Sequence, residues 1–250
     1  MEVNLISYTI DCDKIPGVAA FTSCSKKNPY ELYNTKTKKD TDDFIKRVVA
    51  YGHHSVIEHS NFTFSISGIS RACSHELVRH RIASYTQQSQ RYVKFNELDV
   101  VVPPKIKENK QAKKIFDDAI KKSADAYQKL LDLGIKPEDA RFCFPNATKT
   151  NLLVTMNARS LMNFFAIRCC RRAQWEIHNL AYKMLKLVKE KAPVVFEKAG
   201  ASCLQKRYCT EGALCCGLAP TFDEIKNGTA NESKIKEYTD KMMEDCDLEK

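Results

Sequence analysis

The 250-residue sequence predicts an α+β fold in which long helices outnumber a few strands. Apolar residues recur at helical spacing in two long stretches, 115–131 and 158–191. One short stretch, 62–66, instead alternates phenylalanine and isoleucine with threonine and serine, as a half-buried strand does. Hydrophobic residues make up 43% of the chain and charged residues 28%, which is the balance of a globular protein with a sizeable core.

Helix and turn signals also mark the first third of the chain. Asp40 and Thr41 are suitable N-terminal caps for a helix that ends before Gly52. The predicted strand should end at Gly68, and a helix should follow over about 70–83.

Two further helices are expected in the middle of the chain. A charged connection, 105–114, should lead into the apolar periodicity of 115–131, and Gly134 should end that helix. Pro137 suits the first turn of a short helix that carries Arg141.

The longest predicted helix runs from near Ala158 to Lys191 and is followed by Pro193. Its apolar side chains, which include Trp175, do not keep to one side. A helix that is apolar on more than one side is normally buried, so we expect this one to lie inside an oligomer.

The end of the chain differs in composition from the rest. Four cysteines fall close together after Gly200, and the tail from Asp223 onward carries nine acidic and five basic residues. The sequence therefore predicts a main domain over residues 1–200 and a Cys-rich, then acidic, extension over residues 201–250.

The preceding 222 residues carry a formal charge of +13, within a net charge of +9 for the whole chain. This charge predicts an anionic ligand, such as a nucleotide, a nucleic acid or an anionic cofactor. A lysine-rich solvated surface is the alternative explanation.

Two classes of protein are disfavoured by the sequence. The longest stretch without a charged residue has twelve residues, His59 to Ser70, whereas a membrane-spanning helix needs about 20 apolar residues. The first residues also lack the pattern of a signal peptide, so we expect the 11 cysteines to be reduced thiols in the cytoplasm.

Glycine-rich phosphate loops and zinc-protease motifs are both missing. No Gly-x-Gly occurs, so any nucleotide must be held by side chains and helix ends. Five of the six histidines lie between His53 and His80, but Arg79 stands where a His-Glu-x-x-His motif starting at His75 would need its second histidine. We therefore predict no metal site.

The segment 79–92 carries the clearest chemical signal. Arg79 and Arg81 would project in different directions from a helix and could contact two different anions. The polar loop expected after them ends in Ser89 and Arg91 and offers hydroxyls and amides suited to a phosphate. An exposed basic helix end with a polar loop is the structural alternative.

A second basic cluster lies on the longest predicted helix. Arg159 and Asn163 are one turn apart on one face, and Arg168 follows among aromatic residues. A guanidinium in apolar surroundings is costly unless an anion or a carboxylate meets it. Ion pairs with nearby glutamates explain Arg171 and Arg172 more readily than Arg168.

Three segments together resemble the signatures of flavin-dependent thymidylate synthases. They are 52–59 (GHHSVIEH), 79–91 (RHRIASYTQQSQR) and 157–177, which begins with NARSL and ends with AQWEI. The segments occur in the order found in that family, and the resemblance covers about residues 40–200. It implies an α+β fold with a small antiparallel sheet, a catalytic domain over 1–200, and a homotetramer whose active sites are shared between subunits.

The resemblance also implies a reaction and its substrates. The family converts deoxyuridylate (dUMP) to thymidylate (dTMP), taking a methylene group from 5,10-methylenetetrahydrofolate and a hydride from FAD that NADPH has reduced. The implied partners are thus small molecules, with neither nucleic acid nor membrane.

By the same resemblance, three residues have catalytic roles: Arg168 beside the uracil ring, Ser89 as a binding hydroxyl that is not a nucleophile, and His53 near the flavin and the folate. The residues implied for dUMP are Glu76, Arg79, Gln87, Ser89, Arg91, Arg141 and Arg168. The residues implied for FAD are Ser55, Arg79, His80, Arg81, Gln87, Asn157, Arg159 and Asn163. His80 and the arginines are expected to stabilise the reduced anionic flavin.

Three other functions fit the sequence less well. A thymidylate synthase of the cysteine-nucleophile type would resemble its family in carrying a Pro-Cys motif, and that dipeptide is absent here. A nucleic-acid-binding protein would carry aromatic residues interleaved with basic ones on a loop or sheet. A zinc site would need closer spacing than Cys203, Cys209, Cys215 and Cys216 provide.

Overall fold

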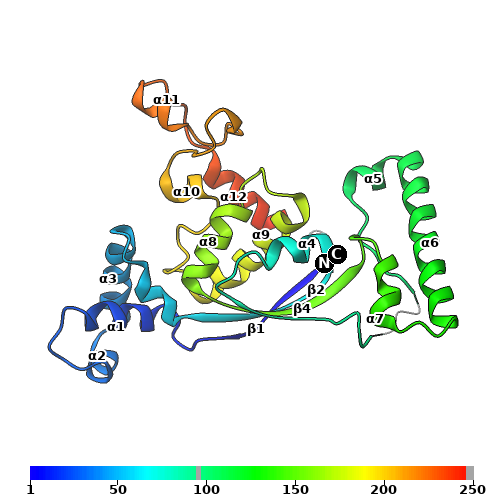
Figure 1. Ribbon diagram of the computed structural model, residues 1–250. Helices are drawn as coiled ribbons and strands as arrows, with labels where there is room; N and C mark the ends of the chain where they lie inside the picture. The colour runs from blue at the N-terminus through cyan, green and yellow to red at the C-terminus, as the bar shows by residue number, and fades with distance from the viewer. Residues whose placement is uncertain (94–96, 246–250) are drawn as a thin grey trace. The chain divides into compact units, whose positions relative to one another are not determined.

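The computed structural model describes residues 1–93 and 97–245 (Figure 1). Four strands form one sheet in the order β1-β2-β4-β3. They are β1 (Glu2–Tyr8), β2 (Asn61–Ser70), β3 (Ser84–Gln87) and β4 (Lys149–Asn157). Thr63 bonds to Thr155 and Gly68 bonds to Asn151, so β2 and β4 run antiparallel. The predicted α+β class and small antiparallel sheet are therefore confirmed.

The chain divides into two compact units. The first unit comprises Met1–Glu2, Ser65–Arg79 and Tyr85–Leu153, and the second comprises Val3–Phe64, His80–Ser84 and Val154–Lys250. Strands β2 and β4 each have one part in either unit. This division does not test the predicted boundary at residue 200, which stays a prediction.

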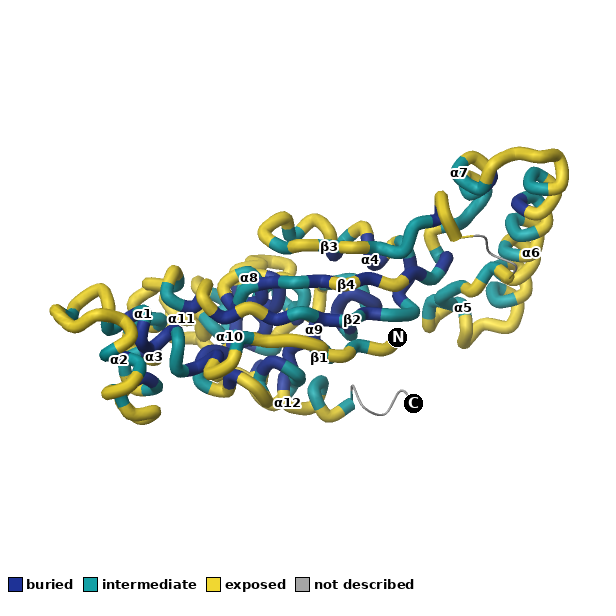
Figure 2. Tube along the Cα trace, turned by 90° about the horizontal axis from the view of Figure 1, so that it is seen from below, coloured by how far each residue is buried: buried dark blue, intermediate teal, exposed yellow. Residues whose placement is uncertain are grey.

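The first unit holds the middle of the chain. Its helices are α4 (Arg71–Leu77), α5 (Pro104–Glu108), α6 (Lys110–Asp132), α7 (Pro137–Ala140) and the 3₁₀ helix η2 (Arg141–Cys143). Helix α6 buries only one residue fully, Tyr127, and most of it is yellow in Figure 2. Gly134 follows α6 with a φ of 81°, as expected for a glycine that ends a helix.

The second unit holds the remaining helices. Before β2 lie α1 (Lys14–Thr22), α2 (Pro29–Thr35), α3 (Lys38–Ala50) and the 3₁₀ helix η1 (His54–His59). After β4 lie α8 (Ala158–Arg168), α9 (Trp175–Lys191), α10 (Ser202–Lys206), the 3₁₀ helix η3 (Gly212–Leu214), α11 (Phe222–Lys226) and α12 (Ile235–Asp245).

An aromatic cluster forms part of the core of the second unit. The ring of Phe196 lies 5.4 Å from that of Phe62 and 6.1 Å from that of Phe165, and all three side chains are fully buried. Edge-to-face contacts of this kind add to the burial of large apolar surface. Phe62 belongs to the strand that the alternating pattern predicted, so that prediction is confirmed.

Helix α9 lies in the same core. Nine of its residues are buried within the single chain, among them His178 and Tyr182. The ring of Tyr238 of α12 contacts both of these side chains, tilted against His178 and edge-to-face with Tyr182, so α12 packs on α9. Much of the burial of this helix is therefore achieved within the single chain, and the oligomer expected from its pattern stays a prediction.

Four of the expected elements differ in the structure. The helix predicted over 158–191 is broken between α8 and α9, where Gln174 caps α9 by accepting bonds from two backbone amides. The residues 84–87, expected as loop, form β3, and much of the charged connection 105–114 is helical. The helix predicted over 70–83 ends at Leu77.

The cap of α3 also lies three residues before the expected one. The side chain of Thr37 accepts a bond from the backbone of Asp40, whose carboxylate in turn accepts a bond from the backbone of Thr37. This reciprocal capping box satisfies two amides that the helix leaves unpaired. Asp40 is thus the third helical residue rather than the cap.

Candidate active site

The residues predicted for the site separate by unit. The positions expected to bind a nucleotide lie in the first unit, except for Arg168. The positions expected to bind a flavin lie in the second unit, as does His53, except for Arg79 and Gln87.

Gln87 is held by two hydroxyl groups of the first unit. Its side-chain nitrogen donates hydrogen bonds to Ser74 Oγ at 3.0 Å and to Thr150 Oγ1 at 3.1 Å. Thr150 is buried on β4 and Ser74 is buried on α4, so both partners are fixed. The nitrogen is fully used, and the carbonyl oxygen of Gln87 is the part of the side chain that can accept a bond from a ligand.

Glu138 links two of the predicted arginines. Arg91 contacts its carboxylate through Nε at 3.0 Å and through Nη2 at 2.9 Å, and the hydrogen bond raises the pKa of Arg91. Arg141 donates from Nε to the backbone oxygen of Glu138 at 3.0 Å. Ser89 accepts a bond from the backbone amide of Arg91 at 3.1 Å, so Ser89, Arg91 and Arg141 belong to one connected group.

Arg71, the first residue of α4, was missed by the sequence analysis. Burial, and then the charge of Arg141, lower the pKa of Arg71, so the two positive charges repel each other. Arg71 makes no ion pair with any residue that the structure describes. Two adjacent, partly buried cations repel unless an anion lies between them. No sequence motif distinguishes Arg71, because it is one arginine at the start of an ordinary helix.

Glu76 lies on α4, and Arg79 lies just beyond the end of that helix. Glu76 is half-buried on α4, and Arg79 is exposed two residues beyond the end of that helix. Because 79–83 is not helical, the expected divergence of Arg79 and Arg81 by helix geometry does not apply.

In the second unit, η1 packs against α8. His53 precedes η1 and Ser55 lies within it, and both are exposed. An ion pair joins the two helices, since Arg159 Nη1 lies 2.5 Å from Glu58 Oε1. Both side chains of this pair are about half exposed, so the pair contributes only about 0–1 kcal/mol and can be exchanged for a ligand.

The start of α8 supplies the other polar groups expected for a flavin. The side-chain oxygen of Asn157 accepts a bond from the backbone of Ser160 at 2.8 Å and so caps the helix. Arg159 and Asn163 are exposed one turn apart on the same helix. A hydroxyl, two amides and an unburied guanidinium fit the diphosphate and polar edge of FAD, which would otherwise need a glycine-rich loop.

The end of α8 carries Arg168, which contacts His80. Arg168 Nε donates a hydrogen bond to His80 Nε2 at 3.1 Å. Burial, and then the positive charge of Arg168, lower the pKa of His80 to about 4. The imidazole packs edge-to-face on Phe164 with ring centres 5.0 Å apart. His80 is thus neutral near pH 7 and carries its proton on Nδ1, since Nε2 accepts.

A neutral His80 changes one expectation. We expected His80 to help stabilise an anionic reduced flavin, but at neutral pH in this structure it has no charge with which to do so. Arg168 keeps the charge, and Arg81 lies exposed in the same segment as His80. Electrostatic stabilisation of an anionic flavin by the second unit would therefore have to come from the arginines of that unit.

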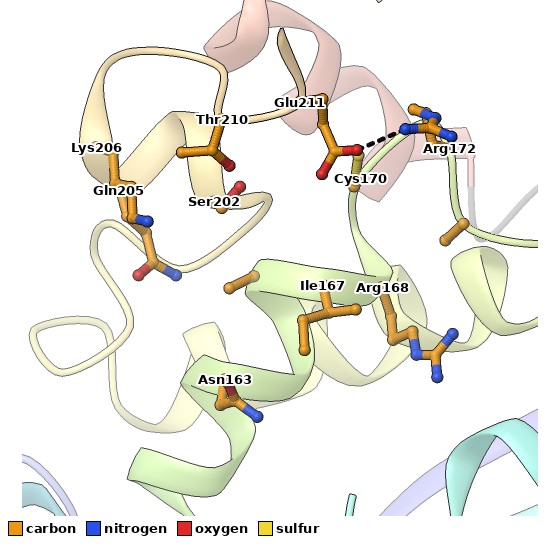
Figure 3. A pocket seen from close by; sticks show the side chains of 12 residues that line it. Asn163, Ile167, Arg168, Cys170, Arg172, Ser202, Gln205, Lys206, Thr210 and Glu211 are labelled. Atoms are coloured by element: carbon orange, nitrogen blue, oxygen red, sulfur yellow. Dashed lines mark hydrogen bonds and ion pairs between the residues drawn. The ribbon is translucent and has the colours of Figure 1, made fainter. Parts of the chain in front are cut away.

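A pocket of about 590 Å³ opens beside Arg168 (Figure 3). One wall is α8 and the turn after it, and the other is the segment 202–211 of the C-terminal extension. The lining residues include Asn163 and Arg168 from the predicted site. The extension therefore contributes directly to the surroundings of Arg168.

The cysteines do not form a metal site in the part of the chain that the structure describes. No group of three or more potential ligands is found among residues 1–93 and 97–245. All ten cysteines within these ranges are free thiols. Burial raises the pKa of Cys203 to about 12 and that of Cys209 to about 11, so both hold their protons at neutral pH.

Among the described residues, no helix combines the length and apolar character that a membrane span requires.

Most of this chain is similar to known proteins of one family. The sequence model of the family described as "Thymidylate synthase complementing protein" matches residues 4–194. This match begins well before residue 40, where the resemblance seen in the sequence motifs begins.

Relatives match over most of their length. A flavin-dependent thymidylate synthase of Geobacter sulfurreducens is 47% identical over 221 residues, which is 88% of this chain and 95% of the relative. Another from Clostridium tetani is 43% identical over 241 residues, covering 90% and 96%.

Solved structures also match this fold. A UMP/dUMP methylase, PolB from Streptomyces cacaoi bound with 5-Br dUMP, superposes with a TM-score of 0.68 at 25% identity. The match covers 78% of this chain and 93% of that one. With the motifs, the two basic groups and these similarities together, the chain belongs to the flavin-dependent thymidylate synthase family.

Proposed function

We propose that this chain is a flavin-dependent thymidylate synthase that converts dUMP to dTMP. Its methylene donor is 5,10-methylenetetrahydrofolate, and its cofactor is FAD, reduced by NADPH. The single observation that carries the proposal is the Arg168–His80 contact, which fixes a permanent cation at the end of the helix that bears Asn157, Arg159 and Asn163. Similarity to relatives named for this activity supports it.

In this proposal Arg168 acts on the uracil ring. The C5 carbon of dUMP must become nucleophilic, which places negative charge on the ring. A guanidinium beside N3 and O2 stabilises that charge, and its planar form can make two hydrogen bonds. His80 holds Nε of Arg168 and so fixes the orientation of the guanidinium plane.

The phosphate of dUMP is assigned to the first unit. Arg91, Arg141 and Ser89 are already connected through Glu138 and the turn, and Arg71 adds a cation close to Arg141. A dianionic phosphate would relieve the repulsion between Arg71 and Arg141. The carbonyl oxygen of Gln87 can accept a hydrogen bond from an N–H or O–H group of the nucleotide.

FAD is assigned to Ser55, Arg159, Asn163 and the amide group of Asn157, with His53 nearby. The flavin supplies the hydride when it is bound and reduced. The phosphates of FAD would replace Glu58 as the partner of Arg159. The arginine would then keep its positive charge beside the bound cofactor.

We also propose a homotetramer with shared active sites. Ile82, Tyr92 and Phe142 are 77%, 81% and 82% exposed, and each directly follows an arginine assigned to the site. Large apolar side chains at such positions are suited to contact with a second subunit. Light scattering after size exclusion should give four times the chain mass of 28.5 kDa.

We further propose that the enzyme works in the cytoplasm and that residues 1–200 form its catalytic domain.

An absorption spectrum of the purified protein tests the proposal most directly. Flavin bands should be present, and NADPH should bleach them when dUMP is added. Chromatography should then detect dTMP after methylenetetrahydrofolate is supplied. Arg168→Ala should abolish dTMP formation while the protein stays yellow. A colourless wild-type protein that FAD cannot reconstitute would overturn the assignment.

Ser89 separates this chemistry from acyl transfer. Ser89→Ala should weaken dUMP binding more than it slows flavin reduction, because the hydroxyl is assigned to binding. Detection of an acyl-serine adduct by mass spectrometry would contradict that role.

A further inference from the structure

We infer that the C-terminal segment 202–211 adds an anion-binding wall to the pocket beside Arg168, with Lys206 as its cation. The wall would hold a carboxylate or phosphate group of a co-substrate, and this inference rests on the proposed function. Neither the motifs nor the family match, which ends at residue 194, assigns a role to this segment.

The pocket has the size and the walls of a ligand site. Its volume of about 590 Å³ lies within the range of about 300–1,000 Å³ typical of small-molecule sites. Helices α8 and α10, which supply residues of the two walls, pack against each other. Figure 3 shows Ser202, Gln205, Lys206 and Thr210 on one side of the space and α8 with Ile167 on the other.

The charge of the lining favours an anion. Three cationic side chains and one carboxylate line the pocket, so its formal charge is +2. Arg172 and Glu211 neutralise each other, since Arg172 Nη1 lies 2.6 Å from Glu211 Oε2. Lys206 is therefore the cation that the segment 202–211 itself adds to the lining. Lys206 is exposed and makes no ion pair within the part of the chain that the structure describes.

The neutral groups of the pocket fit an oxyanion attached to a carbon chain. The hydroxyls of Ser202 and Thr210 and the amide of Gln205 can donate hydrogen bonds to its oxygens. Gln205 already bonds to the backbone oxygen of Gly200 at 3.3 Å, which keeps its side chain on this wall. Ile167 supplies apolar surface for the uncharged part of the ligand.

Two co-substrates of the proposed reaction carry such groups. The folate ends in glutamyl carboxylates, and NADPH differs from NADH by one phosphate. Titration calorimetry on the flavin-loaded enzyme can separate them, because the two members of each pair differ in the number of anionic groups that they carry. The probes are tetrahydrofolate with one or five glutamyl groups, and NADP⁺ or NAD⁺.

Lys206→Gln and Lys206→Glu form a graded series, and Lys226→Gln is the matched control. Lys226 is likewise the exposed last residue of a five-residue helix in the extension, but it does not line the pocket. We expect Lys206→Gln to weaken binding of the more highly charged member of one pair by about three- to tenfold. Lys206→Glu should weaken it further, and Lys226→Gln should leave it unchanged.

The outcome identifies the source of the anion or rejects the site. A selective loss for the pentaglutamate assigns the wall to the carboxylates, and a selective loss for NADP⁺ assigns it to the phosphate. Equal affinities for both members of each pair in all variants would overturn the inference. Thermal unfolding of each variant shows that a loss is not caused by misfolding.

This experiment can fail separately from the proposed function. Binding is measured without turnover, so it reports on the wall even in an enzyme that makes no dTMP. Conversely, normal dTMP formation with unchanged affinities in the Lys206 variants would leave the proposed function standing and remove only the anion-binding wall.

Discussion

The Nε atom of Arg168 donates a hydrogen bond to Nε2 of His80 at 3.1 Å, joining two residues that lie 88 positions apart in the chain. The half-buried, neutral imidazole of His80 fixes the guanidinium without neutralising it. A carboxylate in the same place would hold Arg168 as firmly but cancel the charge that the uracil ring needs.

Replacing His80 tests this positioning role. His80→Gln keeps an acceptor for Arg168 Nε, whereas His80→Phe keeps the ring shape and removes the acceptor. Loss of a hydrogen bond to a charged group costs about 1.5–3 kcal/mol, so we expect kcat for dTMP formation to fall about 10- to 100-fold in the phenylalanine variant. The glutamine variant should retain most activity. Equal activity in both variants would remove the role.

The lowered pKa of His80 predicts a pH effect on stability. An unfolded histidine takes up a proton near pH 6.5, whereas folded His80 does so only near 4. Between these values the unfolded state binds more protons, so the free energy of unfolding falls as the pH falls from about 6.5 to 4. Urea titrations should show a steeper loss in the wild type than in His80→Gln. Parallel curves would contradict the lowered pKa.

Arg71 should show opposite effects on binding and on stability. Arg71→Gln removes one of two repelling cations, so the thermal midpoint should rise or stay constant. The same change should raise KM for dUMP about tenfold, because a charged contact to phosphate is lost. Arg47→Gln, in an exposed arginine of α3, is the control. An unchanged KM for dUMP would exclude Arg71 from the phosphate site.

Separate substitutions of Arg159 and Glu58 distinguish the role of the arginine in FAD binding from the role of the ion pair that the two residues form. Arg159→Gln should weaken FAD binding about tenfold, because a contact to the cofactor's diphosphate is lost. Glu58→Gln breaks the same exposed pair, yet it should leave FAD binding unchanged or stronger. Fluorescence titration of the apoprotein with FAD gives both affinities. Equal weakening in the two variants would mean that the pair itself matters.

Much of the fold could be predicted from local patterns. The alternation around Phe62 and Phe64 predicts β2 because one face of that strand is buried. The break between α8 and α9 was missed because no glycine or proline marks it, and because its cap, Gln174, is a rare capping residue. Strand β3 was missed because its four residues are mostly polar.

The site was predictable in its residues but not in its contacts. Sequence motifs single out His80 and Arg168 separately, yet their hydrogen bond depends on how 80–84 and α8 fold together. Arg71 has no motif, and only its nearness to Arg141 in the folded chain distinguishes it. The wall that carries Lys206 lies in a segment whose composition predicts only an appendage.

The ring of Phe196 also bears on where this protein can be shortened. The match to the family model stops at residue 194, but Phe196 fills the space between Phe62 and Phe165. Loss of a buried phenylalanine costs about 3–5 kcal/mol, a large part of the stability of most domains. A truncation placed where the family-model match ends would leave a hole in the hydrophobic interior, so a minimal expressed fragment has to run past that residue.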